Sequence, residues 1–412
     1  MHDRITRQFC LAGEQSKTLP NKNNRQCVST TGEKMKELGL YVHIPFCVSK
    51  CKYCSFNSYS GKDGLQTEYI KAIVKEIKTY KEKVKDREIT TIFIGGGTPS
   101  HLMAGGISTI LGAIRKIFKL STDCEITIEA NPNSLTYEKV QEWKSAGINR
   151  VSIGYQTSKN ALLRRIGRTH SKGDIFTATK HLHAVGLDNI NIDLMIGLPT
   201  QKQKDVKNAL NMVLKCGANH VSAYTLILEE GTPLYNSVNK GEVKVPKEEK
   251  TLAMYNFLKK YLAKHGFSRY EVSNFSLPGH ECKHNLNCWD LQEYIGFGAG
   301  AHSYYDDYRY SNLDSIEEYI KSINVDKTAI ETREKITLHE EFEEYVMLGL
   351  RKTTGINLEI IKNRYNIDLI KIKGDTINKY LSLNMLRLNN NQLTPTDEGF
   401  NVLNKIILDI VY

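Results

Sequence analysis

The stretch Gly39-Leu-Tyr-Val-His-Ile-Pro-Phe-Cys47-Val-Ser-Lys-Cys51-Lys-Tyr-Cys54-Ser-Phe-Asn57 joins an apolar, strand-like run to three closely spaced cysteines. The run ends at Pro45, and the cysteines follow in C-x3-C-x2-C spacing. Three thiolates on one short loop can hold three corners of an iron–sulfur cube and leave the fourth iron without a protein ligand. Because an open iron can bind and reduce another molecule, this spacing indicates chemistry rather than a structural staple.

Two other cysteine chemistries compete with the cluster. Structural zinc uses two C-x2-C pairs, and Cys282 and Cys288 do not supply a second pair at that spacing. A redox pair made of Cys51 and Cys54 leaves Cys47 without a role. The spacing therefore favours the cluster.

Composition indicates a soluble intracellular protein. The 412 residues include nine cysteines, an odd number, and no secretory segment precedes them. No apolar run approaches the roughly 18 residues that span a bilayer, although peripheral membrane contact stays open. The net charge is +10, but the lysines of residues 71–85 alternate with acidic residues, as on a solvated helix face. We expect at most a weak attraction for an anionic substrate or partner.

Residues 1–38 show no periodicity and predict a poorly ordered extension. Met35 lies just before the first strand and is a candidate for the true start. A transit peptide in residues 1–34 would make the protein organellar, and its arginines fit that reading. Asp3 and Glu14 argue against it, because such peptides are poor in acidic residues. The sequence favours a cytoplasmic location.

From Leu40 to about residue 230, short apolar runs alternate with amphipathic helical stretches, beginning with a helix over about 66–84. The expected strands are 40–44, 89–94, 125–130, 150–155, 189–196 and 220–228. Six strands alternating with helices predict parallel βα units, and six fall short of the eight of a closed barrel. We expect an α/β fold with a partial (βα)6 barrel over residues 39–230.

The pattern changes beyond this barrel. Residues 231–312 combine a helix with a Gly- and aromatic-rich segment, which we expect to close the barrel. Residues 313–412 are mostly helical and end in a two-strand wing over about 381–394. They predict a smaller, mainly helical, winged-helix-like domain.

Polar residues and glycines follow several of the expected strands. Gly95-Gly-Gly-Thr-Pro99 could be a plain tight turn, or it could let a ligand approach the backbone. Glu129, Gln156 and Asp193 each end a strand, which is the ligand face in βα architectures. One such residue is often a helix cap. Three on successive units, together with Arg168, favour a ring that binds ribose and carboxylate groups.

These features together resemble a radical S-adenosylmethionine (SAM) protein, and more narrowly the oxygen-independent coproporphyrinogen III oxidase family. The resemblance covers about residues 39–408 and rests on a set of motifs. They are Tyr41-Val-His-Ile-Pro-Phe-Cys47, Ile153-Gly-Tyr-Gln156, Gly167-Arg-Thr-His170, Asp193-Leu-Met-Ile-Gly-Leu-Pro199 and Gly296-Phe-Gly-Ala-Gly-Ala-His302.

The resemblance implies which residues bind cofactors. Cys47, Cys51 and Cys54 would ligate a [4Fe–4S] cluster whose open iron binds SAM. Positions matching SAM contacts in the family are Tyr41, Gly96, Glu129, Arg168 and Asp193. Positions around the same ligand, or around a second SAM in the oxidases, are Tyr53, Gly97, Thr98 and Gln156. The implied chemistry is one-electron reduction of the sulfonium, which gives a 5′-deoxyadenosyl radical.

One departure separates two branches of this family. The oxidases resemble C-x3-C-x2-C-x-C, whereas this chain has Phe56 at the position of the fourth cysteine. Phe56-Asn57 resembles the HemW branch of haem chaperones, as does His284-Asn285 followed by Trp289. That branch usually has a tyrosine where this chain has Cys288. His284 is the candidate haem contact, and a histidine that bonds within a core is the alternative.

Three functions follow. The first is a haem chaperone that holds a SAM-coordinated [4Fe–4S] cluster and transfers haem to an acceptor protein. The second is a coproporphyrinogen III oxidase, which decarboxylates its substrate to protoporphyrinogen IX; Phe56 argues against it and leaves enzymatic activity open. The third, a winged-helix nucleic-acid binder, lacks a basic recognition helix. Haem or porphyrin, an acceptor and an electron donor are the expected partners, without nucleic acid.

Overall fold

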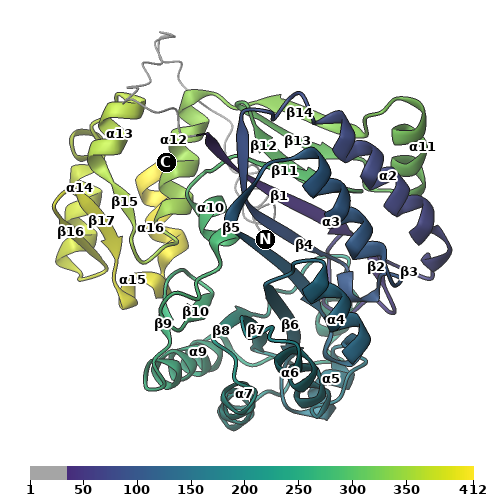
Figure 1. The fold of residues 1–412 in the computed structure, drawn as a ribbon. Coiled ribbons are helices and arrows are strands. Elements are labelled where there is room, and N and C mark those ends of the chain that lie inside the picture. Colours follow the sequence, from purple (N-terminus) through teal and green to yellow (C-terminus); the bar gives the residue numbers. More distant parts are fainter. Residues whose placement is uncertain (1–34) are drawn as a thin grey trace.

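Six parallel strands lie next to one another in chain order and form the centre of one large sheet (Figure 1). The computed structural model describes residues 35–412. The six strands are β1 (Lys36–Ile44), β4 (Arg87–Gly96), β5 (Leu120–Ala130), β6 (Arg150–Gln156), β7 (Ile190–Ile196) and β8 (His220–Thr225). The helices between them are α2 (Gln66–Thr79), α3 (Gly106–Ile117), α4 (Tyr137–Ser145), α5 (Asn160–Arg165), α6 (Asp174–Ala184) and α7 (Gln203–Lys215). This arrangement confirms the expected α/β fold of six βα units.

The two faces of this sheet differ in chemistry because successive side chains of a strand point to opposite faces. One set is aliphatic and belongs to the main hydrophobic cluster: Ile92, Ile94, Ile126, Ile128, Val151, Ile153, Ile192 and Val221. The alternating set, which we call the inner face, is polar: Thr91, Glu125, Thr127, Glu129, Arg150, Ser152, Asn191, Asp193, His220 and Ser222. Burial of the aliphatic set against the helices holds the sheet, and the inner face is left for binding.

Later strands lengthen the sheet at both edges. β10 (Asn274–Ser276) pairs antiparallel with β8 and with β9 (Ser268–Arg269). At the other edge, β11 (Tyr294–Phe297) pairs parallel with β1 and is followed by β12 (His302–Tyr305), β13 (Tyr308–Asn312) and β14 (Ile330–Lys335). The hydrogen-bonded order runs from β14 to β9. Residues 231–312 thus supply strands to both edges, and the limits of the predicted domains stay a prediction.

Helices α8 (Pro233–Asn239), α9 (Glu248–Ala263), α10 (Lys283–Trp289) and α11 (Ile316–Val325) lie between or beside these strands. The C-terminal region has its own hydrophobic cluster and lies on the left in Figure 1. Its helices are α12 (Leu338–Gly349), α13 (Leu358–Tyr365), α14 (Leu369–Ser382), α15 (Asp397–Asn401) and α16 (Leu403–Val411). The predicted wing is the antiparallel pair β16 (Leu386–Asn389) and β17 (Gln392–Pro395), and β15 (Ile356–Asn357) adds a third strand.

Several predicted boundaries differ from the structure: β5 begins at Leu120 rather than at residue 125, and β8 ends at Thr225 rather than at residue 228. β1 begins at Lys36 rather than Leu40, because Leu38 is buried and pairs with Ile89 of β4. Residues 36–38 therefore belong to the sheet and not to the predicted extension. α2 ends at Thr79 instead of about residue 84, and turns continue to residue 86. The interpretations of residues 1–34 concern a segment outside the described residues, and Met35 as the true start stays a prediction.

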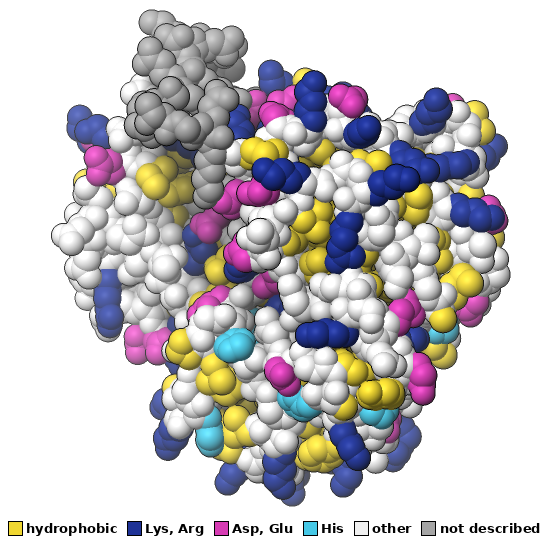
Figure 2. All heavy atoms as spheres, in the orientation of Figure 1, with side chains coloured by type: hydrophobic (Ala, Val, Ile, Leu, Met, Phe, Trp, Pro, Cys, Tyr) yellow, Lys and Arg dark blue, Asp and Glu magenta, His cyan; other side chains and the backbone are white. Residues whose placement is uncertain are grey.

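None of the helices within residues 35–412 combines the length and the apolar character that crossing a bilayer requires. On the face drawn in Figure 2, Lys and Arg side chains are scattered among acidic and apolar ones. The basic side chains on this face therefore do not gather in a single patch.

Candidate metal centre and ligand site

The cysteine loop follows β1 directly. Pro45 ends the strand, and Phe46–Cys47 forms the short strand β2, which pairs with β3 (Tyr59–Ser60). Cys47 is buried, whereas Cys51 and Cys54 are half-buried, and all three are thiols that form no disulfide within residues 35–412. Burial raises the pKa of the Cys47 thiol, and the Cys54 and Cys51 sulfurs nearby raise it further. A bound cation would reverse this effect by stabilising thiolates.

The Gly95–Pro99 turn packs against the start of this loop. The backbone N–H of Gly97 donates to Ile44 O (2.8 Å), and that of Thr98 donates to Phe46 O (2.9 Å). The Thr98 hydroxyl lies 3.4 Å from Cys47 Sγ, and a Cβ on Gly97 would lie 3.0 Å from the same sulfur. The turn therefore leaves just enough room for Cys47. A larger residue at position 97 would displace the Cys47 side chain.

Gly96 needs to be glycine for two reasons. Its φ of 118° lies in a region that L side chains rarely adopt, and a Cβ would lie 2.7 Å from the His43 ring. Its backbone N–H donates to Glu129 Oε2 (3.1 Å). The turn thereby links the end of β4 to the carboxylate that ends β5.

Arg168 joins the cysteine loop to the ends of two strands. Its Nη1 donates to Cys51 Sγ (3.7 Å), and its Nη2 donates to Asn131 Oδ1 (2.5 Å) and to the carbonyl of Gly154. Tyr53 packs nearby against Leu162, Ile166, Met195 and Leu198, and burial raises its pKa.

Glu129 and Asp193 place two carboxylates on the inner face. Burial, with Asp193 as the next cause, raises the pKa of Glu129 to about 7. Burial also raises the pKa of Asp193, which accepts hydrogen bonds from Asn191 Nδ2 (2.7 Å) and Ser152 Oγ (3.4 Å). Two neighbouring carboxylates whose charged forms are disfavoured suit a ligand that brings positive charge and hydroxyl groups.

Gln156 ends β6 with a strained backbone. Its φ is 66°, which is uncommon for a residue other than glycine, and the register of β6 with β7 shifts at this point. Its Oε1 is buried and has no hydrogen-bond partner in the part of the chain that the structure describes. A strained residue with an unsatisfied amide at the mouth of the site is consistent with a ligand that is held there.

These residues fit the cluster and SAM that the sequence suggested. Within residues 35–412, no three His, Cys, Asp or Glu side chains converge closely enough to hold one metal ion. A cube of four irons and four sulfides keeps its cysteine sulfurs on separate corners, so it needs a more open set of thiols. The loop supplies three thiols, Gly97 leaves the space beside Cys47 open, and Gln156 has an unsatisfied amide oxygen among the described residues, all of which suit the cluster and SAM.

His284 lies apart from this group. It contacts Thr91 of β4, and the rise of a strand puts Thr91 roughly 16 Å from Gly96 at the cysteine loop. Its Nδ1 lies 2.9 Å from the Thr91 hydroxyl, and its ring stacks on Phe93. Its side chain is buried, and burial, with Arg150 as a second cause, lowers its pKa to about 3. The imidazole is therefore neutral at physiological pH, and its Nδ1 is engaged with Thr91.

Glu125 anchors the helix that carries His284. Its carboxylate accepts from the backbone N–H of Lys283 and of His284 (3.1 Å each) and from Cys282 Sγ (3.5 Å). A negative side chain at a helix N-terminus accepts hydrogen bonds from the first backbone N–H groups and interacts favourably with the helix dipole. α10 is thus held against the inner face of β5.

Arg150 and its neighbours were not predicted from the sequence. The side chain is 1% exposed, and its Nε and Nη2 have no hydrogen-bond partner among the described residues. Nearby, a continuous hydrogen-bonded chain runs from Tyr270 through His220 to Asn191 (2.8 and 2.7 Å) and on to Asp193. The alternation of polar with apolar residues along each strand is the signal that could have identified this set.

Other residues at the site were also not predicted from the sequence. His43 lies between Gly96 and the cysteine loop: its Nδ1 is 3.0 Å from the Tyr41 hydroxyl, and its Nε2 is 2.8 Å from Asn57 O. Asn131, which holds Arg168, also donates to the Thr98 hydroxyl (3.4 Å). Only the three-dimensional arrangement brings these residues together.

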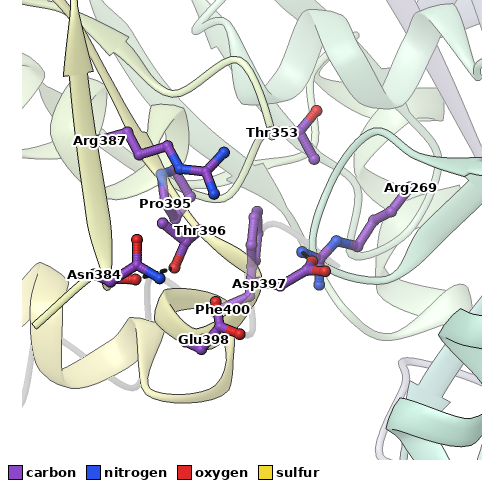
Figure 3. Close-up of a pocket in the computed structure, with 9 residues that line it drawn as sticks. All are labelled: Arg269, Thr353, Asn384, Arg387, Pro395, Thr396, Asp397, Glu398 and Phe400. Carbon is purple, nitrogen blue, oxygen red and sulfur yellow. Dashed lines mark hydrogen bonds and ion pairs between the residues drawn. The ribbon is translucent and has the colours of Figure 1, made fainter.

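A separate pocket of about 410 Å³ lies between β9 and the wing (Figure 3). Arg269 spans it, with its guanidinium over the Phe400 ring and its Nη2 donating to Asp397 (2.6 Å). Lys259 also pairs with Asp397 (3.1 Å). The polar groups here mainly join the C-terminal region to the sheet, so this pocket is not our candidate site.

A comparison with protein families matches the region that carries the cysteine loop and the strand ends described above. Residues 41–213 match the radical SAM superfamily, and residues 336–402 match the HemN C-terminal domain. Among solved structures, coproporphyrinogen III oxidase (HemN) from Escherichia coli, described as a radical SAM enzyme, superposes with a TM-score of 0.80. It shares 20% identity, and the match covers 91% of this chain and 90% of that chain. At this identity the likeness confirms the fold.

Curated proteins give a closer match. Heme chaperone HemW of Lactococcus lactis is 37% identical over 374 residues, which are 90% of this chain and 97% of that protein. Heme chaperone HemW of Bacillus subtilis is 38% identical over 80% of this chain and 87% of its own length. The Escherichia coli protein of the same name is 37% identical over 65% and 70%. The resemblance inferred from the motifs is confirmed.

Proposed function

This chain belongs to the HemW family of radical SAM proteins, and from that membership we propose that it is a haem chaperone. It binds haem together with a SAM-coordinated [4Fe–4S] cluster and passes the haem to an acceptor protein. The observation that carries the proposal is the 37% identity along 97% of a relative named as a heme chaperone. The protein works in the cytoplasm, with an electron donor and a haem acceptor as its protein partners.

The cluster and SAM have assigned residues in this proposal. Cys47, Cys51 and Cys54 hold the cluster, which supplies an electron to the sulfonium of SAM when both are bound. SAM is contacted by Tyr41, Gly96, Glu129, Arg168 and Asp193, with Tyr53, Gly97, Thr98 and Gln156 around it. The contacts of Gly96 with Glu129 and of Arg168 with Cys51 support this assignment, because they link the glycine turn, the strand ends and the cysteine loop.

Each group of residues has a distinct task. Glu129 and Asp193 accept hydrogen bonds from ligand hydroxyl groups and balance the positive charge of SAM. Arg168 orients the Cys51 side chain by donating a hydrogen bond to its sulfur. The glycine turn keeps side chains away from the space next to Cys47.

His284 is our candidate for the haem contact. Its Nδ1 is engaged with Thr91, which fixes the ring orientation and leaves Nε2 for iron, as in other histidine ligands. Because the imidazole is neutral over the physiological range, haem binding at this position would not require loss of a proton. His284→Ala should weaken haem binding in an absorbance titration, and unchanged affinity would reject the assignment.

A decarboxylation assay separates the chaperone from the oxidase. The anaerobically reconstituted full chain is incubated with coproporphyrinogen III, SAM and a reductant, and the products are separated by chromatography. We expect no protoporphyrinogen, because Phe56 stands where the oxidases carry a further cysteine. Conversion of coproporphyrinogen III at the rate of an authentic oxidase would overturn the proposal.

A further inference from the structure

The glycine-rich turn Gly298–Gly300 lies against the end of the cysteine loop. Asn57, which follows Cys54 by three residues in the sequence, donates from Nδ2 to the carbonyls of Ala299 (3.3 Å) and Asp314 (3.0 Å). The carbonyl of Asn57 in turn lies 2.8 Å from His43 Nε2, which must carry the proton in this hydrogen bond. One side chain therefore connects the loop to a segment more than 200 residues away in sequence.

Helix α2 holds the turn from the other side. The buried Tyr69 hydroxyl accepts from the Ala299 N–H (2.8 Å) and donates to the carbonyl of His43 (2.9 Å). The buried Glu76 carboxylate accepts from the Gly298 N–H (2.9 Å). These hydrogen bonds tie the turn to α2 and to the end of β1, so it provides a fixed surface for Asn57.

The packing leaves no room for a side chain at either glycine. A Cβ on Gly298 would lie 2.5 Å from the Tyr69 hydroxyl, and a Cβ on Gly300 would overlap the amide nitrogen of Asn57. Both glycines also have positive φ, 101° and 69°. The close approach of this turn to Asn57 is thus a requirement of the structure and not a loose surface contact.

We propose that the Gly298–Gly300 turn is a clamp that fixes the cysteine loop for cluster binding, with Asn57 as the positioning residue. The inference rests on the cluster of the proposed function. Cys47 is buried and Tyr53 is packed, but Val48 is 62% exposed and Cys54 is only half-buried, so the Cys54 end of the loop depends more on hydrogen bonds. Ligands that are already in position lose less conformational entropy when they bind.

The first test uses the cluster-free full chain. The rate at which iodoacetamide alkylates Cys54, measured by peptide mass spectrometry, should rise about tenfold in Asn57→Ala, because two hydrogen bonds no longer hold the loop. Asn149→Ala is the matched control: its side chain also joins two backbone groups (2.8 Å each), but it precedes β6, at the end of the parallel strands opposite to the cysteine loop. An alkylation rate equal to that of the wild type would overturn the clamp.

The second test measures release of iron from the reconstituted protein to a chelator. Release should be about tenfold faster in Asn57→Ala and unchanged in Asn149→Ala, even if both lose similar stability. Gly300→Ala should accelerate release more in the wild-type background than in Asn57→Ala, because part of its effect is the collision with Asn57. Equal effects in both backgrounds would contradict the clamp. If the wild type bound no cluster, the proposed function would fail, while the alkylation rates would still decide the clamp.

Discussion

Burial of the Glu129 carboxylate lowers the stability of the folded protein, whereas the same carboxylate is proposed to bind SAM. Glu129→Gln keeps an acceptor for the Gly96 N–H but removes the charge. We expect the free energy of unfolding at pH 8 to rise by about 1–3 kcal/mol, because the pKa of this carboxyl is raised to about 7 in the folded protein. SAM affinity should fall about tenfold or more. Urea unfolding and calorimetric SAM titration measure the two effects.

The pH dependence of this prediction has a definite sign. Between about pH 4.5 and 7 the unfolded chain ionises this carboxyl while the folded chain keeps the proton, so stability of the wild type falls as pH rises. The gain from Glu129→Gln should therefore vanish near pH 4.5 and be complete above pH 7. Glu271→Gln is the control, since burial also raises the pKa of Glu271 to about 7. It should gain stability with unchanged SAM affinity; a similar loss of SAM affinity would contradict the role of Glu129.

At the residue scale, the sequence predicted the parts of the site that depend on spacing or on strand position. Cys47 and Glu129 belong to this group. His43 and Asn57 could not be predicted, because their contacts with Gly96 and Ala299 exist only after distant strands come together. Arg150 could have been suspected from the polar alternation of β6, but its lack of a hydrogen-bond partner is visible only in the structure.

At the scale of elements, α10 depends on one carboxylate. Glu125→Ala removes the acceptor for two backbone N–H groups and for the Cys282 thiol. We expect a loss of about 1–3 kcal/mol in stability and faster amide hydrogen exchange over residues 283–289. Because α10 carries His284, haem affinity should fall as well.

Thr136→Ala provides a control for this effect. Thr136 caps α4 by accepting from Lys139 N, so its loss also costs about 0.5–2 kcal/mol, but α4 carries none of the proposed ligands. Reduced haem affinity in Glu125→Ala alone would support the role of α10. Equal haem affinity in both variants would show that haem does not depend on α10.

Element boundaries were predicted well where a local signal exists. Pro45 ends β1 at the expected residue, because proline disrupts strand pairing. The starts of β1 at Lys36 and of β5 at Leu120, and the end of α2 at Thr79, were missed. The start of β1 is set by tertiary packing, because Leu38 is buried against β4, a contact that the polar residues around it conceal.

For the whole molecule, the two tryptophans report on the two hydrophobic clusters. Trp143 lies in the cluster of the sheet, and Trp289 lies in the smaller C-terminal cluster. In urea, Trp143→Phe, which keeps only the Trp289 signal, should show a fluorescence transition at lower denaturant than Trp289→Phe. The reason is that a smaller core buries less apolar surface.

Coincident transitions in both variants would instead mean that the clusters unfold as one unit. Charged contacts join the two regions and favour their unfolding as one unit. Examples are Arg269 with Asp397 and Arg309 with Glu344. The six parallel strands β1 and β4 to β8 were predictable from alternating apolar runs, whereas the parallel pairing of β11 with β1 was not. The extension of the sheet at both edges was also not predictable, because it pairs residues 294–297 with β1 across most of the chain.

Haem binding by the anaerobically reconstituted full chain tests the central claim most directly. Haem is added stepwise, and the absorbance of the Soret band is recorded until it no longer changes. The proposed function predicts a saturable shift with a defined end point, which is weakened in His284→Ala and kept in Thr136→Ala. A linear increase that matches free haem, with no saturation, would contradict the haem chaperone function.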